Sequence, residues 1–187
     1  GLFFQREGGA QRQQQLELAR LALGLPQGQV QLRADLEVGA QVGHAGACPD
    51  VLFAATTAEE LGGHGALWLL GGTRPDVCIA LEIAPVAPDN DLQVTPTPTC
   101  WSTDGYSPTA PQDLDLVAAA AKVAGTGVSF HALTRGGSDA SCAAASGHCA
   151  RPITLALPVD NTHGFEVMHI GAIGALTQLT TALLKTI

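Results

Sequence analysis

A series of short apolar segments, separated by stretches with helical periodicity, constrains the fold of this chain more than any other feature. The segments 51–57, 77–81 and 153–157 are short and largely apolar, as expected of buried strands, and 128–133 is a further predicted strand. Strands that are apolar on both faces lie in sheets that helices cover on both sides. The sequence therefore predicts an α/β fold with three layers, α/β/α, around a mostly parallel or mixed sheet.

Helices are predicted between these strands and near both ends of the chain, where apolar residues recur at helical spacing. The first of them, 11–23, is followed by Gly24 and Pro26, which are typical of a helix end. Segment 29–38 alternates between polar and apolar residues and predicts a strand exposed on one face. Segment 85–111 is rich in Pro, Thr, Asp and Ser, and we expect loops and one irregular strand there. The other predicted helices are 59–70, 113–123, 138–146 and 166–184.

The composition supplies a core and restricts the possible partners. Apolar residues make up 46% of the 187 residues, which is enough for a buried core and argues against a disordered chain. With 9 Lys and Arg against 17 Asp and Glu, the net charge is −8. The chain thus lacks the basic face that binding to nucleic acid or to an anionic membrane requires. No apolar run reaches the roughly 18–20 residues that span a bilayer.

The cysteines and the first residues favour an intracellular protein. The five cysteines are irregularly spaced and form no CxxC motif, so we expect reduced, mostly buried thiols. Residues 1–6 lack the long apolar core of a signal peptide. We therefore expect a cytoplasmic location. The cysteines are Cys48, Cys78, Cys100, Cys142 and Cys149.

Three carboxylates and one histidine follow the predicted strands, at the edge of the sheet where ligands bind in such folds. Glu59 and Glu60 stand where a strand gives way to a helix, so that one can bind a metal ion while its neighbour faces a water. Glu82 and His163 each come shortly after a buried strand. Alone, each residue is compatible with a helix cap, a polar strand end or a loop histidine. Together, carboxylates and imidazole suit Zn²⁺, Co²⁺ or Mn²⁺.

A glycine-rich turn follows another predicted strand. Gly136 and Gly137 lie between a strand and a short helix, where backbone N–H groups can bind an anion or the main chain of a substrate. A P-loop is excluded, because no Gly-Lys-Ser/Thr follows. We therefore consider both glycines candidate substrate-binding residues.

Four motifs occur in a specific order. They are Thr-x-Glu-Glu-x-Gly-x-x-Gly-Ala at 57–66, Asp-Val-Cys-Ile-Ala-Leu-Glu at 76–82, Gly-Gly-Ser-Asp-Ala at 136–140 and Asn-Thr-His-x-x-Glu at 161–166. Together they resemble the glutamyl/tetrahedral aminopeptidase family of dinuclear metallopeptidases, which includes cellulase-M-like proteins. The resemblance runs from about residue 51 to the C-terminus and implies a zinc-peptidase-like fold.

The resemblance also implies a division of the chain into two regions. Segment 32–40 resembles a stretch of the dimerisation domain that is inserted in this family. Residues 1–43 would then be a remnant of that domain. Residues 44–187 would be part of a metallopeptidase-like catalytic domain.

The site residues take their roles from the same resemblance. Glu59 would be the general base, Glu60 and His163 would bind one metal ion, and Glu82 would bind the other, with Zn²⁺ or Co²⁺ as the cofactor. The implied activity is a metal-dependent aminopeptidase that hydrolyses N-terminal residues from peptides with a metal-activated water. Peptides are the expected substrates, and a homo-oligomer is the expected assembly.

Two motifs of the family are missing from this sequence. They are a His-x-Asp motif near the start and the Asp that bridges the two metals. His44 and Asp50 do not have the His-x-Asp spacing, and Asp35 lies too close to segment 51–57. Two interpretations stay open: the motifs lie outside these residues, or the protein is a non-catalytic or truncated relative with an interaction or structural role. A serine hydrolase is disfavoured, because no Gly-x-Ser-x-Gly elbow occurs.

This ligand set predicts weak metal binding. Glu60 and His163 supply two ligands for one ion and Glu82 supplies one for the other, whereas a catalytic zinc site normally has three protein ligands. We expect calorimetric titration with Zn²⁺ or Co²⁺ to find at most one site, and a weak one. Two tight sites would contradict this expectation and would direct the search for further ligands to residues 35–50.

Overall fold

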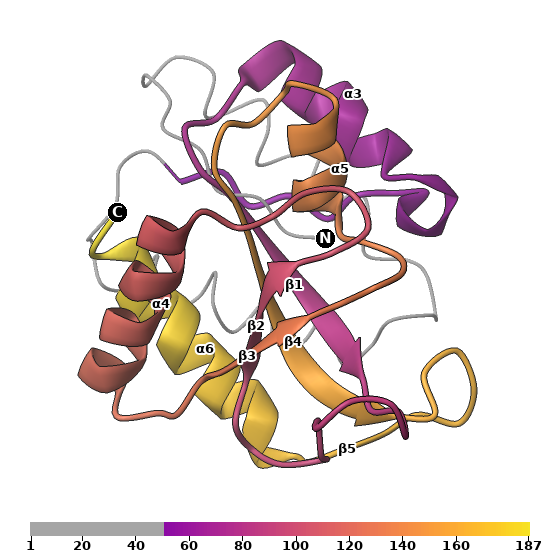
Figure 1. Cartoon of the computed structure of the whole chain (residues 1–187). Coiled ribbons are helices and arrows are strands. Elements are labelled where there is room, and N and C mark those ends of the chain that lie inside the picture. The colour runs from indigo at the N-terminus through magenta and orange to yellow at the C-terminus, as the bar shows by residue number, and fades with distance from the viewer. Residues whose placement is uncertain (1–50) are drawn as a thin grey trace.

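The computed structural model describes residues 51–187 (Figure 1). The helix and strand predicted at 11–23 and 29–38, Cys48, and the proposed remnant 1–43 lie outside the described residues. The elements in chain order are η1 (Glu59–Leu61), α3 (His64–Thr73), β1 (Cys78–Pro85), β2 (Thr99–Thr103), α4 (Pro111–Ala124), β3 (Ser129–Ala132), α5 (Asp139–Ala145), β4 (Pro152–Asp160), β5 (Val167–Met168) and α6 (Gly171–Leu184).

The strands form one mixed sheet, as predicted. Their order is β1-β4-β2-β3, and β5 pairs with β4 outside this path. β1 runs parallel to β4, and β2 runs parallel to β3, whereas the β2–β4 and β4–β5 pairs are antiparallel. β2 is the irregular strand expected within 85–111, and its register with β3 shifts between Trp101 and Thr103.

Helices cover both faces of the sheet, which confirms the three-layer prediction. α4 and α6 pack together on one face, and α3 and α5 pack together on the other (Figure 1). The alternation of side chains along β1 explains the two cores. Ile79 and Leu81 point into a core built largely from Leu, Ile and Val, whereas Cys78 and Ala80 point into a second core made mostly of small side chains. Small side chains let α3 and α5 lie close to the sheet, beside the site described below.

The segment 51–57, predicted as a buried strand, forms no strand. Its apolar character does reflect burial: Val51 and Phe53 pack against the larger core and Ala54 against the smaller one. A strand also needs a neighbour for its backbone hydrogen bonds. Within residues 51–187, β1 pairs with β4 alone, and no described strand joins its other edge.

The predicted helix 59–70 is also wrong in detail. Gly62 and Gly63 have φ values of 98° and 68°, which an α-helix cannot contain. The segment therefore divides into η1 and α3, and α3 continues to Thr73. The positive φ values of these two glycines turn the chain between η1, which bears the two glutamates, and the helix that anchors it.

Other boundaries differ because backbone pairing continues beyond the apolar residues. Parallel pairing with β4 extends β1 to Pro85, so Glu82 lies within the strand and not after it. The helix predicted from residue 166 begins at Gly171, because residues 167–168 pair with β4 as β5.

Two further observations concern the described part of the chain. Cys78, Cys100, Cys142 and Cys149 are buried free thiols, as expected. None of the helices within residues 51–187 has the length and apolar character needed to cross a membrane.

Two glycines of α3 provide a matched test of this geometry. A Cβ on Gly65 would lie 2.5 Å from the Thr57 carbonyl oxygen, whereas a Cβ on Gly72 would meet open space. We expect Gly65→Ala to destabilise the fold by about 1–3 kcal/mol, because the backbone of the preceding loop must shift. We expect Gly72→Ala to be neutral or to stabilise the fold by about 0.5–1 kcal/mol. Denaturant unfolding measures both, and equal effects would contradict the tight packing of α3 against residue 57.

Candidate active site

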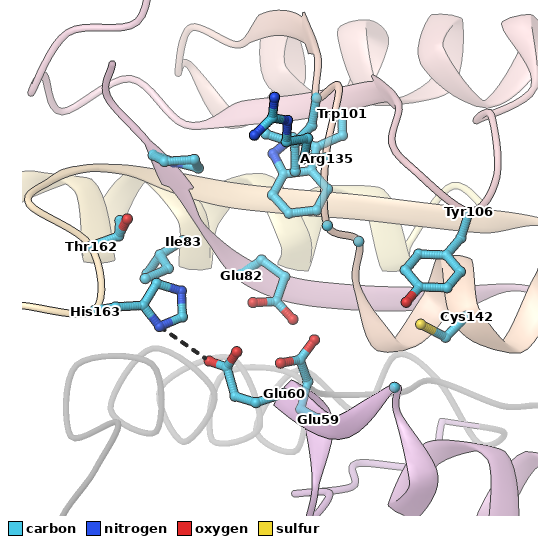
Figure 2. A pocket seen from close by; sticks show the side chains of 15 residues that line it. Glu59, Glu60, Glu82, Ile83, Trp101, Tyr106, Arg135, Cys142, Thr162 and His163 are labelled. Carbon is cyan, nitrogen blue, oxygen red and sulfur yellow. Dashed lines mark ion pairs between the residues drawn. The ribbon is translucent and has the colours of Figure 1, made fainter.

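The four segments proposed from the sequence meet at one open cavity of about 250 Å³. It lies where β1, the loop after β4, the turn after β3 and η1 come together (Figure 2). The side chains around it combine carboxylates with aromatic and aliphatic groups. The lining residues are Glu59, Glu60, Gly62, Glu82, Ile83, Pro85, Trp101, Tyr106, Leu133, Arg135, Gly136, Gly137, Cys142, Thr162 and His163.

A tight loop presents Glu59 and Glu60 to the cavity. Ala58 before them has a φ of 55°, which is rare for a residue with a side chain. The N–H groups of Gly62 and Gly63 donate to the Glu59 carbonyl, and the Gly65 N–H donates to the Thr57 carbonyl. These bonds close the loop, so the carboxylates of Glu59 and Glu60 both face the cavity (Figure 2).

The loop is anchored to the glycine-rich turn through a buried carboxylate. The Thr56 hydroxyl donates to Oδ2 of Asp139, which is fully buried at the start of α5. The adjacent Ser138 caps α5 in a reciprocal pair with Ser141. The end of α5 thereby fixes both the glutamate loop and the turn that carries Gly136 and Gly137.

Glu60 and His163 lie together although they are far apart in the sequence. His163 Nδ1 is 3.7 Å from Glu60 Oε1, and both side chains are more than two-thirds exposed, at 71% and 74%. So exposed an ion pair adds little stability. His163 also has a φ of 63°, and its N–H donates to Glu166 Oε1. The strained backbone of His163 gains only a weak ion pair with Glu60. Its conformation is therefore better explained by a function than by stability.

Glu82 faces the same cavity from β1. Its carboxylate points toward those of Glu59 and Glu60 from across the cavity, whereas His163 lies beside Glu60 (Figure 2). The structure therefore brings the three glutamates and the histidine into one site.

The environment makes Glu59 a stronger base than an ordinary glutamate. Burial raises the pKa of its carboxyl group most, and the nearby charges of Asp139 and Glu60 raise it further, against a smaller opposite effect of His163. A carboxylate with a raised pKa accepts a proton more readily at neutral pH. This property fits the general-base role that the family resemblance implies.

The donor set suits a divalent cation but is incomplete. Carboxylate and imidazole are ordinary ligands of Zn²⁺ and Co²⁺. Within residues 51–187, however, no group of three or more His, Cys, Asp or Glu side chains is arranged to hold a metal ion. Burial, with Asp139 next in importance, raises the pKa of Cys142 to about 11, so this cavity thiol stays protonated at neutral pH and is a poor ligand.

Several residues of the cavity have no counterpart in the sequence-based prediction. Trp101, Tyr106 and Arg135 line it together with the predicted Gly136 and Gly137. Trp101 and Tyr106 lie in a Pro- and Thr-rich segment, and nothing in its sequence indicates that it packs near the turn at Gly136 and Gly137. The Asp-Gly pair before Tyr106 does indicate a turn, but not where that turn packs.

Comparison with protein families matches residues 36–179 to the model of the M42 glutamyl aminopeptidases. Among curated proteins, no match is found.

Solved structures of aminopeptidases share the fold. A TET aminopeptidase from a marine-sediment Thaumarchaeota archaeon is 19% identical, with a TM-score of 0.73 over 81% of this chain and 45% of its own. An aminopeptidase from Desulfurococcus kamchatkensis is 21% identical, with a TM-score of 0.64 over 70% and 40%. The Pyrococcus horikoshii TET1 peptidase is 24% identical, with a TM-score of 0.59 over 66% and 37%. The chain thus spans less than half the length of each of these structures.

The raised pKa of Glu59 predicts a pH-dependent stability. Burial, Asp139 and Glu60 all disfavour the charged carboxylate of Glu59. Protonation of Glu59 therefore stabilises the folded state, and this stabilisation is lost as the pH rises through the shifted pKa. We expect Glu59→Gln to raise the melting temperature of the protein in EDTA at neutral pH. The difference should vanish below the ordinary pKa of a glutamate, where the wild-type carboxyl group is neutral in both states.

An exposed carboxylate on α4 provides the control for this measurement. Asp115→Asn removes a charge far from the cavity, and we expect no comparable gain. A melting temperature of Glu59→Gln equal to or below that of the wild type at neutral pH would contradict the assigned environment of Glu59.

Proposed function

Because the chain belongs to the M42 glutamyl aminopeptidase family, we propose that it forms the catalytic part of a metal-dependent aminopeptidase that removes N-terminal residues from peptides. The observation that carries this proposal is the convergence of Glu59, Glu60, Glu82 and His163 at one cavity. Residues 44–187 would be this catalytic part, and residues 1–43 the remnant of a dimerisation domain.

The metal ligands in the proposal are Glu60 and His163 for one ion and Glu82 for the other. A bound Zn²⁺ or Co²⁺ ion lowers the pKa of water and polarises the peptide carbonyl group. The short distance between Glu60 and His163 supports a shared ion. Complete sites need further ligands from outside residues 51–187, in keeping with the absence of a group of three within them.

Glu59 moves the proton in the proposed reaction. Its carboxylate takes a proton from the attacking water and passes it to the nitrogen of the departing amine, so that the peptide bond is hydrolysed without net gain or loss of protons on the enzyme. The raised pKa of this half-buried carboxyl group supports the assignment. General-base catalysis of this kind contributes about 10²–10⁴-fold to the rate.

The charge of the cavity favours the N-terminus of a peptide. Three carboxylates line it against one exposed cation, Arg135, so a protonated α-amino group is attracted. Backbone N–H groups at Gly136 and Gly137 are the proposed contacts for the substrate main chain. Both features support cleavage at the N-terminal end.

The proposal includes a homo-oligomeric assembly and a cytoplasmic location. The Pyrococcus horikoshii TET1 peptidase is described as assembling into a tetrahedron or a large octahedral shell, and we propose a homo-oligomer for this chain. Exposed apolar side chains such as Trp68, Phe165 and Ile170 supply surface that an oligomer could bury. The buried free thiols support a reducing compartment, the cytoplasm.

One observation favours a second function, that of a non-catalytic relative with an interaction or structural role. Within residues 51–187, no group of three possible metal ligands occurs. Such a relative would keep the fold and the cavity but would hydrolyse no peptide. Assays with added Zn²⁺ or Co²⁺ separate the two functions directly.

Replacement of the proposed base tests the enzymatic function. We expect Glu59→Gln to keep any metal binding of the wild type and to lower kcat on an aminoacyl-anilide by about 10²–10⁴-fold, because an amide cannot accept the proton. Asp115→Asn should retain wild-type kcat. Equal rates for Glu59→Gln and the wild type would refute the general-base assignment, and no hydrolysis by the full-length protein with either metal would favour the non-catalytic relative.

A further inference from the structure

We infer that Tyr106 contacts the peptide substrate and forms one wall of its binding cavity, a placement that the missing side chain of Gly137 makes possible. The inference rests on the proposed function for the identity of the ligand, a peptide. It assigns a specificity-determining residue outside the carboxylate and histidine cluster. Three features of the structure support it: a rigid turn, a close approach to Gly137, and a ring face that is open to the cavity.

The turn that carries Tyr106 is fixed by its own hydrogen bonds. Oδ1 of Asp104 accepts the N–H groups of Tyr106, at 2.8 Å, and Ser107, at 3.0 Å. The Asp104 N–H donates to the Ser107 carbonyl at 3.3 Å. An aspartate that caps its own turn in this way limits the directions in which the tyrosine can point.

The same turn is attached to the glycine-rich turn of the site. The Gly105 N–H donates to the Gly136 carbonyl at 2.9 Å, and a Cβ on Gly105 would lie 2.7 Å from that oxygen. The Leu133 N–H donates to the Thr103 carbonyl, also at 2.9 Å. Two connections between these segments hold Tyr106 in place relative to the cavity.

The tyrosine ring lies directly on the backbone of Gly137. A Cβ on Gly137 would be 2.3 Å from Cδ2 and 2.9 Å from Cε2 of Tyr106, closer than any real contact. Only glycine allows this packing. The sequence predicted that the Gly-Gly pair binds substrate through its N–H groups. In addition, the missing side chain of Gly137 leaves the space that the Tyr106 ring occupies.

Tyr106 nevertheless remains 52% exposed, whereas Trp101, which lines the same cavity, is 5% exposed. Part of the Tyr106 ring is therefore accessible to a ligand in the cavity. Figure 2 shows Tyr106 at one end of the cavity and His163 at the other, with Glu59 between them. A peptide with its amine among the carboxylates would extend a side chain toward Tyr106. The free ring face suits an apolar side chain.

The chain contains one tyrosine and two tryptophans, and indole absorbs in the same range as phenol, so a spectral change is assigned to Tyr106 where Tyr106→Phe loses it. In EDTA, which prevents turnover by a metal enzyme, we expect titration with the tripeptide Leu-Gly-Gly to change the phenol absorbance band in step with binding measured by calorimetry. Tyr106→Phe should lose this spectral change and keep its affinity within about 2-fold, because the ring stays. Peptide binding with no change in the phenol band would overturn the inference.

Variants test the wall itself. We expect Tyr106→Ala to weaken peptide binding about 10-fold, as for loss of an aromatic contact. Gly137→Ala should weaken binding to a similar extent, because the ring must move away. The same Cβ would lie 2.9 Å from Ser141 Oγ in the α5 cap, so an unchanged melting temperature is required of this variant. The double variant should bind no more weakly than either single variant, because both changes remove one contact. Gly174→Ala, where a Cβ meets open space on α6, is the control and should bind as the wild type does.

Wild-type affinity in Tyr106→Ala, or additive losses in the double variant, would overturn the inference. Two outcomes separate the contact with Tyr106 from the proposed enzymatic function. Peptide binding that perturbs Tyr106, without hydrolysis by the full-length protein in Zn²⁺ or Co²⁺, would refute the proposed enzymatic function and support the contact with Tyr106. Hydrolysis with the same KM in the wild type and Tyr106→Ala would support the enzymatic function and refute the contact with Tyr106.

Discussion

The parallel pairing of β1 with β4 positions both the sheet and the candidate site. The two strands match from Cys78 opposite Pro152 to Pro85 opposite Val159. Parallel strands end at the same edge of a sheet, so Glu82 and the loop after β4 that carries His163 must lie near each other. The pairing therefore brings two of the candidate ligands together before any side chain interacts.

Unusual backbone conformations complete the site. Ala58, Asn161 and His163 have positive φ values although they are not glycines, and all three lie in or next to the loops that carry Glu59, Glu60 and His163. Such conformations have a free-energy cost that the surrounding structure must offset. Here the buried Asp139, bonded to Thr56, and the closed loop from Thr57 to Gly65 provide that support. Within residues 51–187, three of the four non-glycine residues with a positive φ thus lie where the proposed chemistry takes place, and the fourth, Arg74, ends α3.

The sequence predicted these features to different degrees. The buried strands at 77–81 and 153–157 can be predicted because a short continuous apolar run is typical of a strand buried on both faces. The site segments can be predicted because ligands in such sheets bind beyond the carboxyl ends of the strands. Segment 51–57 shows the limit of that reasoning, because apolar residues report burial and not hydrogen-bonded pairing. The break at Gly62 and Gly63 does have a signal in the sequence, the adjacent glycines, but the apolar residues from Ala66 to Leu70 favour one continuous helix. Tyr106 could not be placed, since its contact with Gly137 depends on tertiary packing alone.

In the proposed site, Glu60 and His163 bind the same metal ion. Crystals of the chain soaked in Zn²⁺ test it most directly, through the anomalous scattering of the metal. We predict an anomalous peak within ligand distance of both the Glu60 carboxylate and the His163 imidazole, with a weaker peak or none at Glu82. A peak on other side chains, with Glu60 and His163 left as the bare ion pair at 3.7 Å, would contradict it.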